Sequence, residues 1–147
     1  MRIKLIIYLS LLGFLLFGCA GIKKTVENSE TASDIKPEYV VKVESFNEDI
    51  SKDFRIIESI IHEDILEIQV SYSGGCAEHD FTMYSTQQYQ KSLPPKLPIF
   101  LVHDNGGDAC RASKTETLLI DIKELRYEGQ KAVQLIINKE HTVDYNY

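Results

Sequence analysis

Two short segments of this 147-residue chain hold the side chains best suited to chemistry. They are "YSGGCAEH" (residues 72–79) and "HDNGGDAC" (residues 103–110). Their thiols, imidazoles and carboxylates belong to Cys76, His79, His103, Asp104, Asp108 and Cys110. Groups of these types bind zinc or copper, a thiol beside an imidazole can act as a nucleophile, and two thiols can form a disulfide. The choice among a metal site, a nucleophile and a disulfide depends on the cellular compartment and on the secondary-structure elements that position these residues.

A metal site is one interpretation of these residues. Cys76 and Cys110 with His79 and His103 make a Cys₂His₂ set of the kind that zinc prefers, and copper accepts the same ligands. The C-x₂-H spacing of the first pair suits a metal, whereas the H-x₆-C spacing of the second pair is loose. If the two cysteines bond to each other instead, the two histidines could bind a metal together with Asp80, Asp104 or Asp108.

The N-terminus indicates export to a bacterial envelope. Two basic residues precede an apolar run at residues 5–17, which is too short to span a bilayer but fits the hydrophobic region of a secretory signal. The run leads into "LFGC" (residues 16–19), which resembles a bacterial lipobox, where a small residue precedes the cysteine that becomes lipidated. The resemblance predicts a lipoprotein signal peptide at residues 1–18 and lipidation of Cys19.

The charge balance narrows the choice of partners. Removal of residues 1–18 leaves 14 of the 16 basic residues against 22 acidic ones, so the formal net charge changes from −6 to −8. This acidity argues against nucleic-acid binding, which needs a basic face, and against electrostatic docking on anionic lipid. We therefore expect contact with the membrane through the lipid anchor. No acidic run directly follows Cys19, so we expect a location in the cell envelope that faces the periplasm.

The mature chain divides into a tether and one domain. Residues 19–38 form the lipidated cysteine and a polar segment that has too few large apolar side chains to offset its ordering entropy. Residues 39–147 are of ordinary size for a single domain with one core.

Cysteine arithmetic favours a disulfide. With Cys19 lipidated, Cys76 and Cys110 remain, and an even remainder in an exported protein usually forms a disulfide. Closing a loop of about 34 residues stabilises a fold by about 4 kcal/mol in the chain-entropy account. We expect this disulfide and no cofactor. Zinc or copper bound by the histidines and neighbouring carboxylates, His79, His103, Asp104 and Asp108, is the alternative.

Hydrophobic patterns from residue 39 onwards predict short strands. Residues 65–72 alternate between apolar and polar side chains, which is typical of a half-buried strand, and residues 99–104 are apolar on both faces, as in a central strand. Prolines place residues 93–98 in a loop, and "NGG" at residues 105–107 predicts a hairpin turn. The remaining strands are expected at residues 39–46, 54–61, 80–85, 115–122 and 131–139, with 141–147 as a continuation.

Seven or eight short strands with almost no helix predict an all-β domain. An antiparallel β-sandwich of immunoglobulin-like architecture is the first expectation, and a small β-barrel is the alternative. No motif of a nucleotide-binding, hydrolase or metalloprotease site occurs. Nucleophilic chemistry at Cys76 would require a free thiolate, so we expect no enzyme.

One resemblance joins the two segments. The elements "GGC-x₂-H-x-F" and "HD-x₃-D-x-C", with a later strand that carries an Asp, resemble a group of uncharacterised bacterial secreted proteins and lipoproteins. The matching positions are Gly74, Gly75, Cys76, His79, Phe81, His103, Asp104, Asp108, Cys110, Asp121 and Leu125. The resemblance implies that the histidines, aspartates and cysteines belong to one local structure, and it implies no reaction. The sequence thus favours a non-catalytic binding or structural module in the envelope, with a metal-binding lipoprotein as the alternative.

Overall fold

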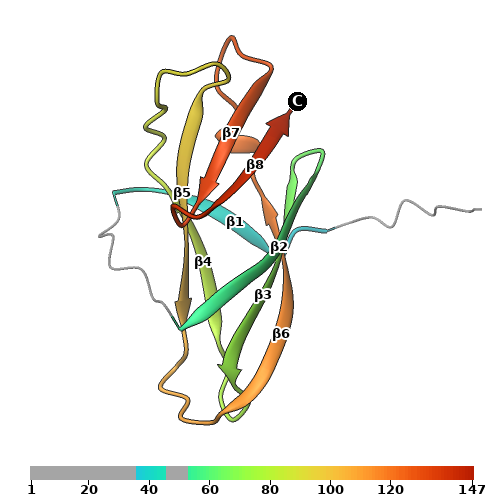
Figure 1. Ribbon diagram of the computed structural model, residues 1–147, viewed down its shortest axis with the longest axis vertical. Helices are drawn as coiled ribbons and strands as arrows, with labels where there is room; N and C mark the ends of the chain where they lie inside the picture. The colour runs from blue at the N-terminus through green and yellow to red at the C-terminus, as the bar shows by residue number, and fades with distance from the viewer. Residues whose placement is uncertain (1–35, 46–52) are drawn as a thin grey trace, which may run out of the picture. The chain divides into compact units, whose positions relative to one another are not determined.

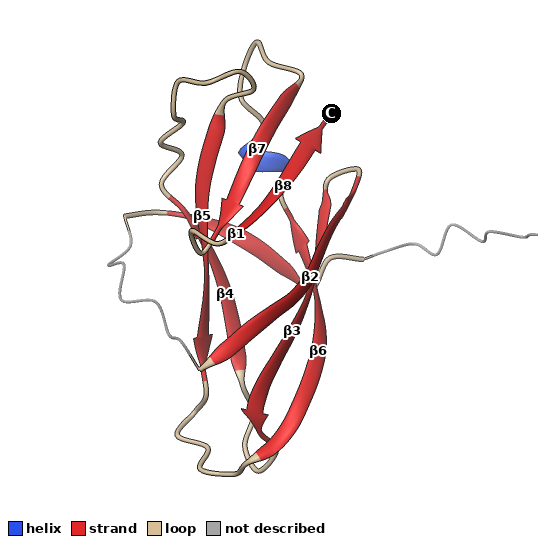
Figure 2. Ribbon diagram, in the orientation of Figure 1, coloured by secondary structure: helices blue, strands red, loops and turns tan. Residues whose placement is uncertain are grey.

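Eight strands and one short helix make up the part of the chain that the computed structural model describes, residues 36–45 and 53–147 (Figure 2). They are β1 (Tyr39–Val43), β2 (Phe54–His62), β3 (Ile65–Gly74), β4 (Asp80–Ser85), β5 (Lys96–Asp104), β6 (Ala112–Asp121), the 3₁₀ helix η1 (Lys123–Leu125), β7 (Ala132–Ile137) and β8 (His141–Asn146). The predicted signal peptide, Cys19 and the tether as far as residue 35 lie outside the described residues. Within those described, no helix combines the length and the apolar character that crossing a membrane requires.

The strands form one sheet in the order β2-β3-β6-β1-β4-β5-β7-β8. β1 is the joint between its two halves, because Tyr39 and Val40 pair with β6 whereas residues 41–43 pair with β4. Figure 1 shows β1 running between the β3/β6 pair and the β4/β5 pair. Five residues therefore connect the two halves of the sheet.

The prediction of an all-β fold is confirmed, but the immunoglobulin-like sandwich is not. β2 and β8 stand at opposite ends of the strand order and still contact each other, so the sheet curls nearly to closure. The alternative prediction of a small β-barrel fits this arrangement. The expectation of purely antiparallel pairing is wrong, because β1 is parallel to both of its neighbours and β5 is parallel to β7. Parallel pairs need crossover connections, which strand patterns do not reveal.

Pro98 lies inside a strand and not in the predicted loop. β5 begins at Lys96, and Pro98 is opposite Ile136 of the parallel strand β7. The pairing of β5 with β4 begins one residue later, at Ile99. A proline is tolerated in a strand where its position needs no backbone N–H donor for a neighbouring strand. Because the pairing with β4 starts only at Ile99, the missing N–H of Pro98 removes no hydrogen bond to β4.

The "NGG" segment does not form the predicted hairpin. Gly106 and Gly107 have positive φ angles of 57° and 75°, as expected for these residues. However, β5 pairs with β4 and β7, whereas β6 pairs with β3 and β1. Residues 105–111 therefore cross from one half of the sheet to the other, and they carry Asp108 and Cys110 with them.

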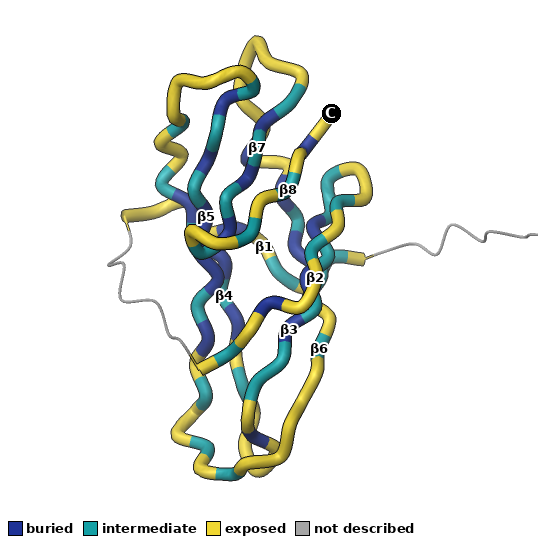
Figure 3. Tube along the Cα trace, viewed as in Figure 1, coloured by how far each residue is buried: buried dark blue, intermediate teal, exposed yellow. Residues whose placement is uncertain are grey.

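Apolar side chains from both halves of the sheet form the core, and Figure 3 shows buried residues along the strands of both halves. β5 is buried on both faces, as predicted, since Ile99, Phe100 and Leu101 are all buried in succession. Each fully buried aliphatic side chain stabilises the fold by roughly 1.5–3 kcal/mol, more than an exposed ion pair contributes. Residues that are fully buried include Leu66, Ile68, Met83, Leu97, Leu118, Ile120, Leu125, Leu135 and Tyr145.

A polar cluster ties β8 to the β2–β3 turn and to η1. Arg126 directs Nη2 to both carboxylate oxygens of Asp64, at 2.7 and 2.9 Å. The buried Tyr145 hydroxyl donates to Asp64 and accepts from Arg126 Nε at 3.1 Å. Burial, followed by the hydrogen bond to Asp64, raises the pKa of Tyr145 above its usual value. The cluster holds together the region in which β8 approaches β2.

We expect Tyr145→Phe to lower the free energy of unfolding by about 1–3 kcal/mol, because it removes the hydrogen bonds between the buried hydroxyl and the charged groups of Asp64 and Arg126. The pKa of Tyr145 is raised on folding, so the stabilisation is complete below pH 10 and decreases as the pH rises further. Denaturant unfolding of both proteins at several pH values measures the effect. Tyr127→Phe, at a 40% exposed residue that stacks on Tyr89, is the control and should change stability little. Equal effects of the two substitutions would contradict the role of this cluster.

Candidate functional site

The register of β3 and β6 brings the two cysteines together. Gly74 is opposite Ala112 in the last register pair of these antiparallel strands. Cys76 lies two residues beyond Gly74 and Cys110 two residues before Ala112, so both cysteines continue the same register. Their sulfurs are bonded, with a Cα–Cα distance of 5.9 Å, which lies in the usual range for a disulfide. The bond confirms the predicted pairing and occupies the one sulfur considered as a nucleophile.

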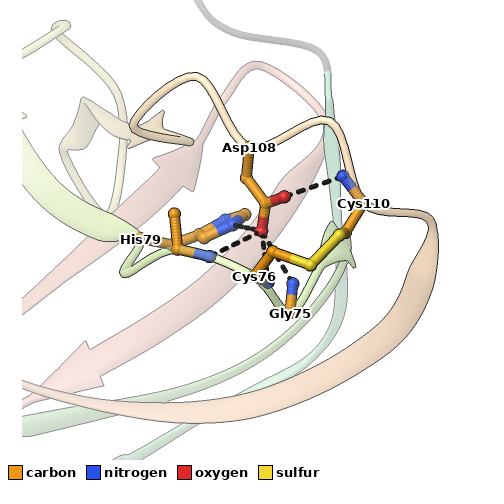
Figure 4. Close-up of a disulfide and its surroundings, with 6 residues drawn as sticks. Gly75, Cys76, His79, Asp108 and Cys110 are labelled. Atoms are coloured by element: carbon orange, nitrogen blue, oxygen red, sulfur yellow. Dashed lines mark hydrogen bonds and ion pairs between the residues drawn. A yellow bond between two sulfur atoms is a disulfide. The ribbon is translucent and has the colours of Figure 1, made fainter.

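The Asp108 carboxylate organises the loop that carries this disulfide (Figure 4). Its Oδ2 atom accepts hydrogen bonds from three successive backbone N–H groups, those of Gly75, Cys76 and Ala77, at 2.8, 2.8 and 3.1 Å. Its Oδ1 atom accepts from the backbone N–H of Cys110 at 2.7 Å. Successive N–H groups that converge in this way form an anion-binding nest. Asp108 is the internal anion of that nest, and it contacts both sides of the disulfide.

Asp108 is held as a carboxylate by these contacts. Its side chain is 1% exposed, and each donor stabilises the negative charge. The hydrogen bonds from the backbone of Cys110 and then of Cys76 lower the pKa of Asp108 far below its ordinary value of 3.8, against the opposing effect of burial. A buried carboxylate with this many donors is both charged and fixed in position.

The two glycines of "GGC" are required for different structural reasons. A Cβ atom on Gly74 would lie 2.5 Å from the His79 ring, so only glycine lets the ring pack there. Gly75 has a φ angle of 116°, which side-chain-bearing residues rarely adopt, and it aims its N–H at Asp108. The motif thus makes room for an imidazole and bends the chain around a carboxylate.

His79 and His103 meet directly. His103 lies on β5 opposite Phe81 of β4, and His79 immediately precedes β4. Nδ1 of His79 is 2.8 Å from Nε2 of His103, while Nε2 of His79 is 3.2 Å from Oδ2 of Asp108. The side chains of His79 and His103 are 3% and 0% exposed. The resemblance implied one local structure for these residues, and the geometry agrees.

Aromatic rings enclose His103. The ring of Phe81 stacks on it with centroids 4.5 Å apart, and Phe54 meets it edge to face at 5.7 Å. Tyr72 lies 5.0 Å from His103 and 4.7 Å from His79. These contacts fix the orientation of both imidazoles, so their ring nitrogens point in defined directions.

The sequence did not predict three residues of this site, which are Asp53, Tyr72 and Glu116. Asp53 accepts a 3.0 Å hydrogen bond from Nδ1 of His103, although it lies 50 residues away in the chain. The Tyr72 hydroxyl donates to Glu116 at 2.8 Å. Burial and this bond raise the pKa of Tyr72 to about 12. Nothing in the pattern around Asp53 marks it, whereas Tyr72 opens the "YSGGC" element and could have been included.

The predicted metal ligands do not all converge. His79, His103 and Asp108 lie together, but Asp104 is exposed and accepts a hydrogen bond from the N–H of Gly106, which closes the turn. Two nitrogens bound to one tetrahedral zinc lie about 3.3 Å apart, given bonds of about 2.0–2.1 Å. The 2.8 Å between the imidazoles is shorter than this, so both rings would have to move to bind one ion. Metal binding stays a prediction.

An open hollow of about 440 Å³ adjoins His79 and Tyr72. Its lining has more acidic than basic side chains, with Lys114 as the basic one among Glu38, Glu78, Asp80 and Glu116. An excess of carboxylates raises the local concentration of cations.

The sequence matches no family model and no curated protein. Solved structures with a similar fold include a NigD-like immunity protein from Bacteroides caccae, at 10% identity and a TM-score of 0.50, which aligns with 65% of this chain and 50% of that protein. Another is a protein of unknown function from Bacteroides vulgatus, at 12% identity and a TM-score of 0.52, over 74% of this chain and 56% of that one. The chain thus spans about half the length of these structures. At such identities the likeness shows the fold alone.

We expect Asp108→Asn to weaken the fold most at neutral pH, because an amide cannot supply the charge or the second acceptor oxygen that the nest holds. The pKa of Asp108 is lowered on folding, so its stabilisation is present above pH 3.8 and is lost as the pH falls below that value. The difference in unfolding free energy between the two proteins should therefore shrink on acidification. Asp104→Asn, in the same loop, is the control with a smaller effect. A difference that stays constant with pH would contradict this role.

Proposed function

We propose that this chain is a lipid-anchored protein of the bacterial envelope whose β-barrel-like domain acts as a binding or structural module without catalysis. In this proposal the protein faces the periplasm, contacts the membrane through lipid on Cys19 and binds no nucleic acid.

The allocation of the three cysteines carries the proposal. Cys76 and Cys110 are bonded to each other, so Cys19 is the one remaining cysteine of the three in the chain. Its position at the end of an apolar run, in a lipobox-like "LFGC", supports lipidation. A disulfide between residues of an accessible loop also supports export, because such bonds persist in oxidising compartments.

The site geometry supports a module without catalysis. The sulfur of Cys76 is oxidised. The ring nitrogens of His79 and His103 are directed at each other and at two carboxylates, so they have structural partners. A general base needs a free nitrogen within reach of a substrate proton. The similarity of the fold to that of an immunity protein is compatible with a role in binding.

Replacement of Cys19 tests the anchor. We expect wild-type protein to fractionate with membranes and to have a mature N-terminus at a lipid-modified Cys19, seen by intact mass. Cys19→Ala should remove both the lipid mass and the membrane association. Without reductant, the unfolded mature wild-type chain should react with no thiol reagent, since the other two sulfurs are bonded.

The double variant Cys76→Ala/Cys110→Ala is the matched control, because it should keep its lipid while losing about 4 kcal/mol of stability. Membrane association of Cys19→Ala equal to that of the wild type, or a mature chain that starts elsewhere, would overturn the proposed anchor.

Metal binding is a second proposed function, favoured by one observation. His79 and Asp108, two of the four predicted ligands, place a nitrogen and an oxygen 3.2 Å apart with both side chains buried. That separation is close to the value of about 3.3 Å for two ligands of one tetrahedral zinc. Copper accepts the same donor types.

A further inference from the structure

A chain of three hydrogen bonds connects two carboxylates through two imidazoles. Asp53 is 3.0 Å from Nδ1 of His103, Nε2 of His103 is 2.8 Å from Nδ1 of His79, and Nε2 of His79 is 3.2 Å from Oδ2 of Asp108. Every ring nitrogen of the pair has one partner. The positions of the protons follow from which groups can donate.

Counting protons along this chain leaves one nitrogen without a hydrogen. A carboxylate such as Asp53 only accepts, so Nδ1 of His103 carries a proton and, in the neutral ring, Nε2 of His103 accepts from Nδ1 of His79. A neutral His79 that donates from Nδ1 has a bare lone pair on Nε2. That lone pair faces the Asp108 carboxylate, and two acceptors at 3.2 Å repel each other.

A proton or a metal ion between Nε2 of His79 and Oδ2 of Asp108 removes this repulsion. A metal ion does so by binding the nitrogen lone pair and the carboxylate together. A metal-bound histidine usually donates its other ring N–H to an acceptor that orients it. Here His103 is that acceptor, and Asp53 in turn orients His103.

Two sulfurs lie near the same carboxylate, in a group of possible ligand atoms that does not include His79. The Sγ atoms of Cys76 and Cys110 and a carboxylate oxygen of Asp108 all lie within 4.8 Å of one another. Sulfurs of a disulfide are poor ligands, whereas thiolates bind zinc strongly. Cys76 is exposed, so a reductant can reach the bond.

We propose that reduction of the Cys76–Cys110 disulfide opens a zinc site in which both thiolates and the Asp108 carboxylate bind one ion. Once the two sulfurs separate, the cysteine side chains and the His79 ring move together, so that Nε2 of His79 becomes the fourth ligand. The inference rests on the second function proposed above and changes its ligand set, since His103 becomes an orienting partner and Asp104 takes no part. In the reduced protein zinc lies between Nε2 of His79 and the Asp108 carboxylate.

The steps balance. A dithiol gives two electrons and two protons to the disulfide, so that Cys76 and Cys110 become thiols and the dithiol becomes a disulfide. Zn²⁺ then displaces both thiol protons into solvent and binds the lone pair on Nε2 of His79. Two thiolates and one carboxylate offset the ion, which gives a small net charge of the kind that structural zinc sites have. The acidic hollow beside His79 lies on the side from which a cation would arrive.

Cobalt, a spectroscopic substitute for zinc, tests the site directly. The full chain in detergent is reduced with a dithiol, freed of it by anaerobic gel filtration and titrated with Co²⁺. We expect one Co²⁺ per chain, with thiolate-to-cobalt charge-transfer absorption and the intense visible bands of tetrahedral coordination, both displaced by Zn²⁺. The oxidised chain should show neither. Circular dichroism of the reduced chain, with and without metal, reports whether the strands remain.

Three variants separate this ligand set from its rivals. Asp53→Asn, which removes the outer partner, should weaken cobalt binding about 10- to 100-fold without changing the charge-transfer band. Asp104→Asn and His62→Gln should bind as the wild type does. A charge-transfer band that depends on Asp104 would overturn the ligand set proposed here.

The remaining outcomes are also decisive. Equal metal binding by oxidised and reduced protein, without a charge-transfer band, would overturn the redox-dependent site while leaving metal binding by the histidines in place. No binding in either state, with the strands retained, would overturn both. Neither result bears on the lipid anchor, which is tested at Cys19.

Discussion

The Asp108 carboxylate is the constraint on which the functional end of this domain depends. It accepts hydrogen bonds from four backbone N–H groups, at residues 75–77 and at Cys110, and it faces His79. One anion thus fixes the bend after β3, the approach to β6 and the position of an imidazole. The disulfide limits how far the two loops can separate, but only Asp108 defines their arrangement, because a disulfide alone requires neither histidine nor a nest.

The topology of the sheet explains why the segment at residues 105–111 needs the hydrogen bonds of Asp108. Residues 105–111 connect strands that are not neighbours, β5 in one half of the sheet and β6 in the other. A hairpin would be held by its own ladder, whereas this crossing segment has none. Asp108 and Cys110 attach it to the residues that follow β3. His103, near the end of β5, connects His79 to Asp53, which immediately precedes β2. Three elements distant in the chain are tied by one polar network.

Local patterns in the sequence predicted the strands and the disulfide. Alternation at Leu66, Ile68 and Val70 fixes a buried face whatever strand lies beside it, and the cysteine count needs no geometry. The arrangement of the sheet was not predictable in this way. β1 pairs in parallel with two strands that lie far along the chain, and its five residues carry no mark of that choice.

The site was predictable in part for the same reason. His79, His103 and Asp108 stand beside the cysteines in sequence, so their grouping followed from spacing, whereas Asp53 reaches His103 only through the fold. Asp104 was included because carboxylates bind metals, but its oxygen closes a tight turn instead. Residue types indicated the chemistry, and register decided which of them meet.

Amide hydrogen exchange at Gly75, Cys76 and Ala77 tests the central role of Asp108 most directly. All three residues are exposed and lie beyond the β3–β6 ladder, so a loop held by the disulfide alone would exchange freely. The account predicts slow exchange of all three amides in the oxidised wild-type chain, together with that of Cys110. Exchange of these amides at the rate of an unstructured peptide, while β3 and β6 stay protected, would contradict it.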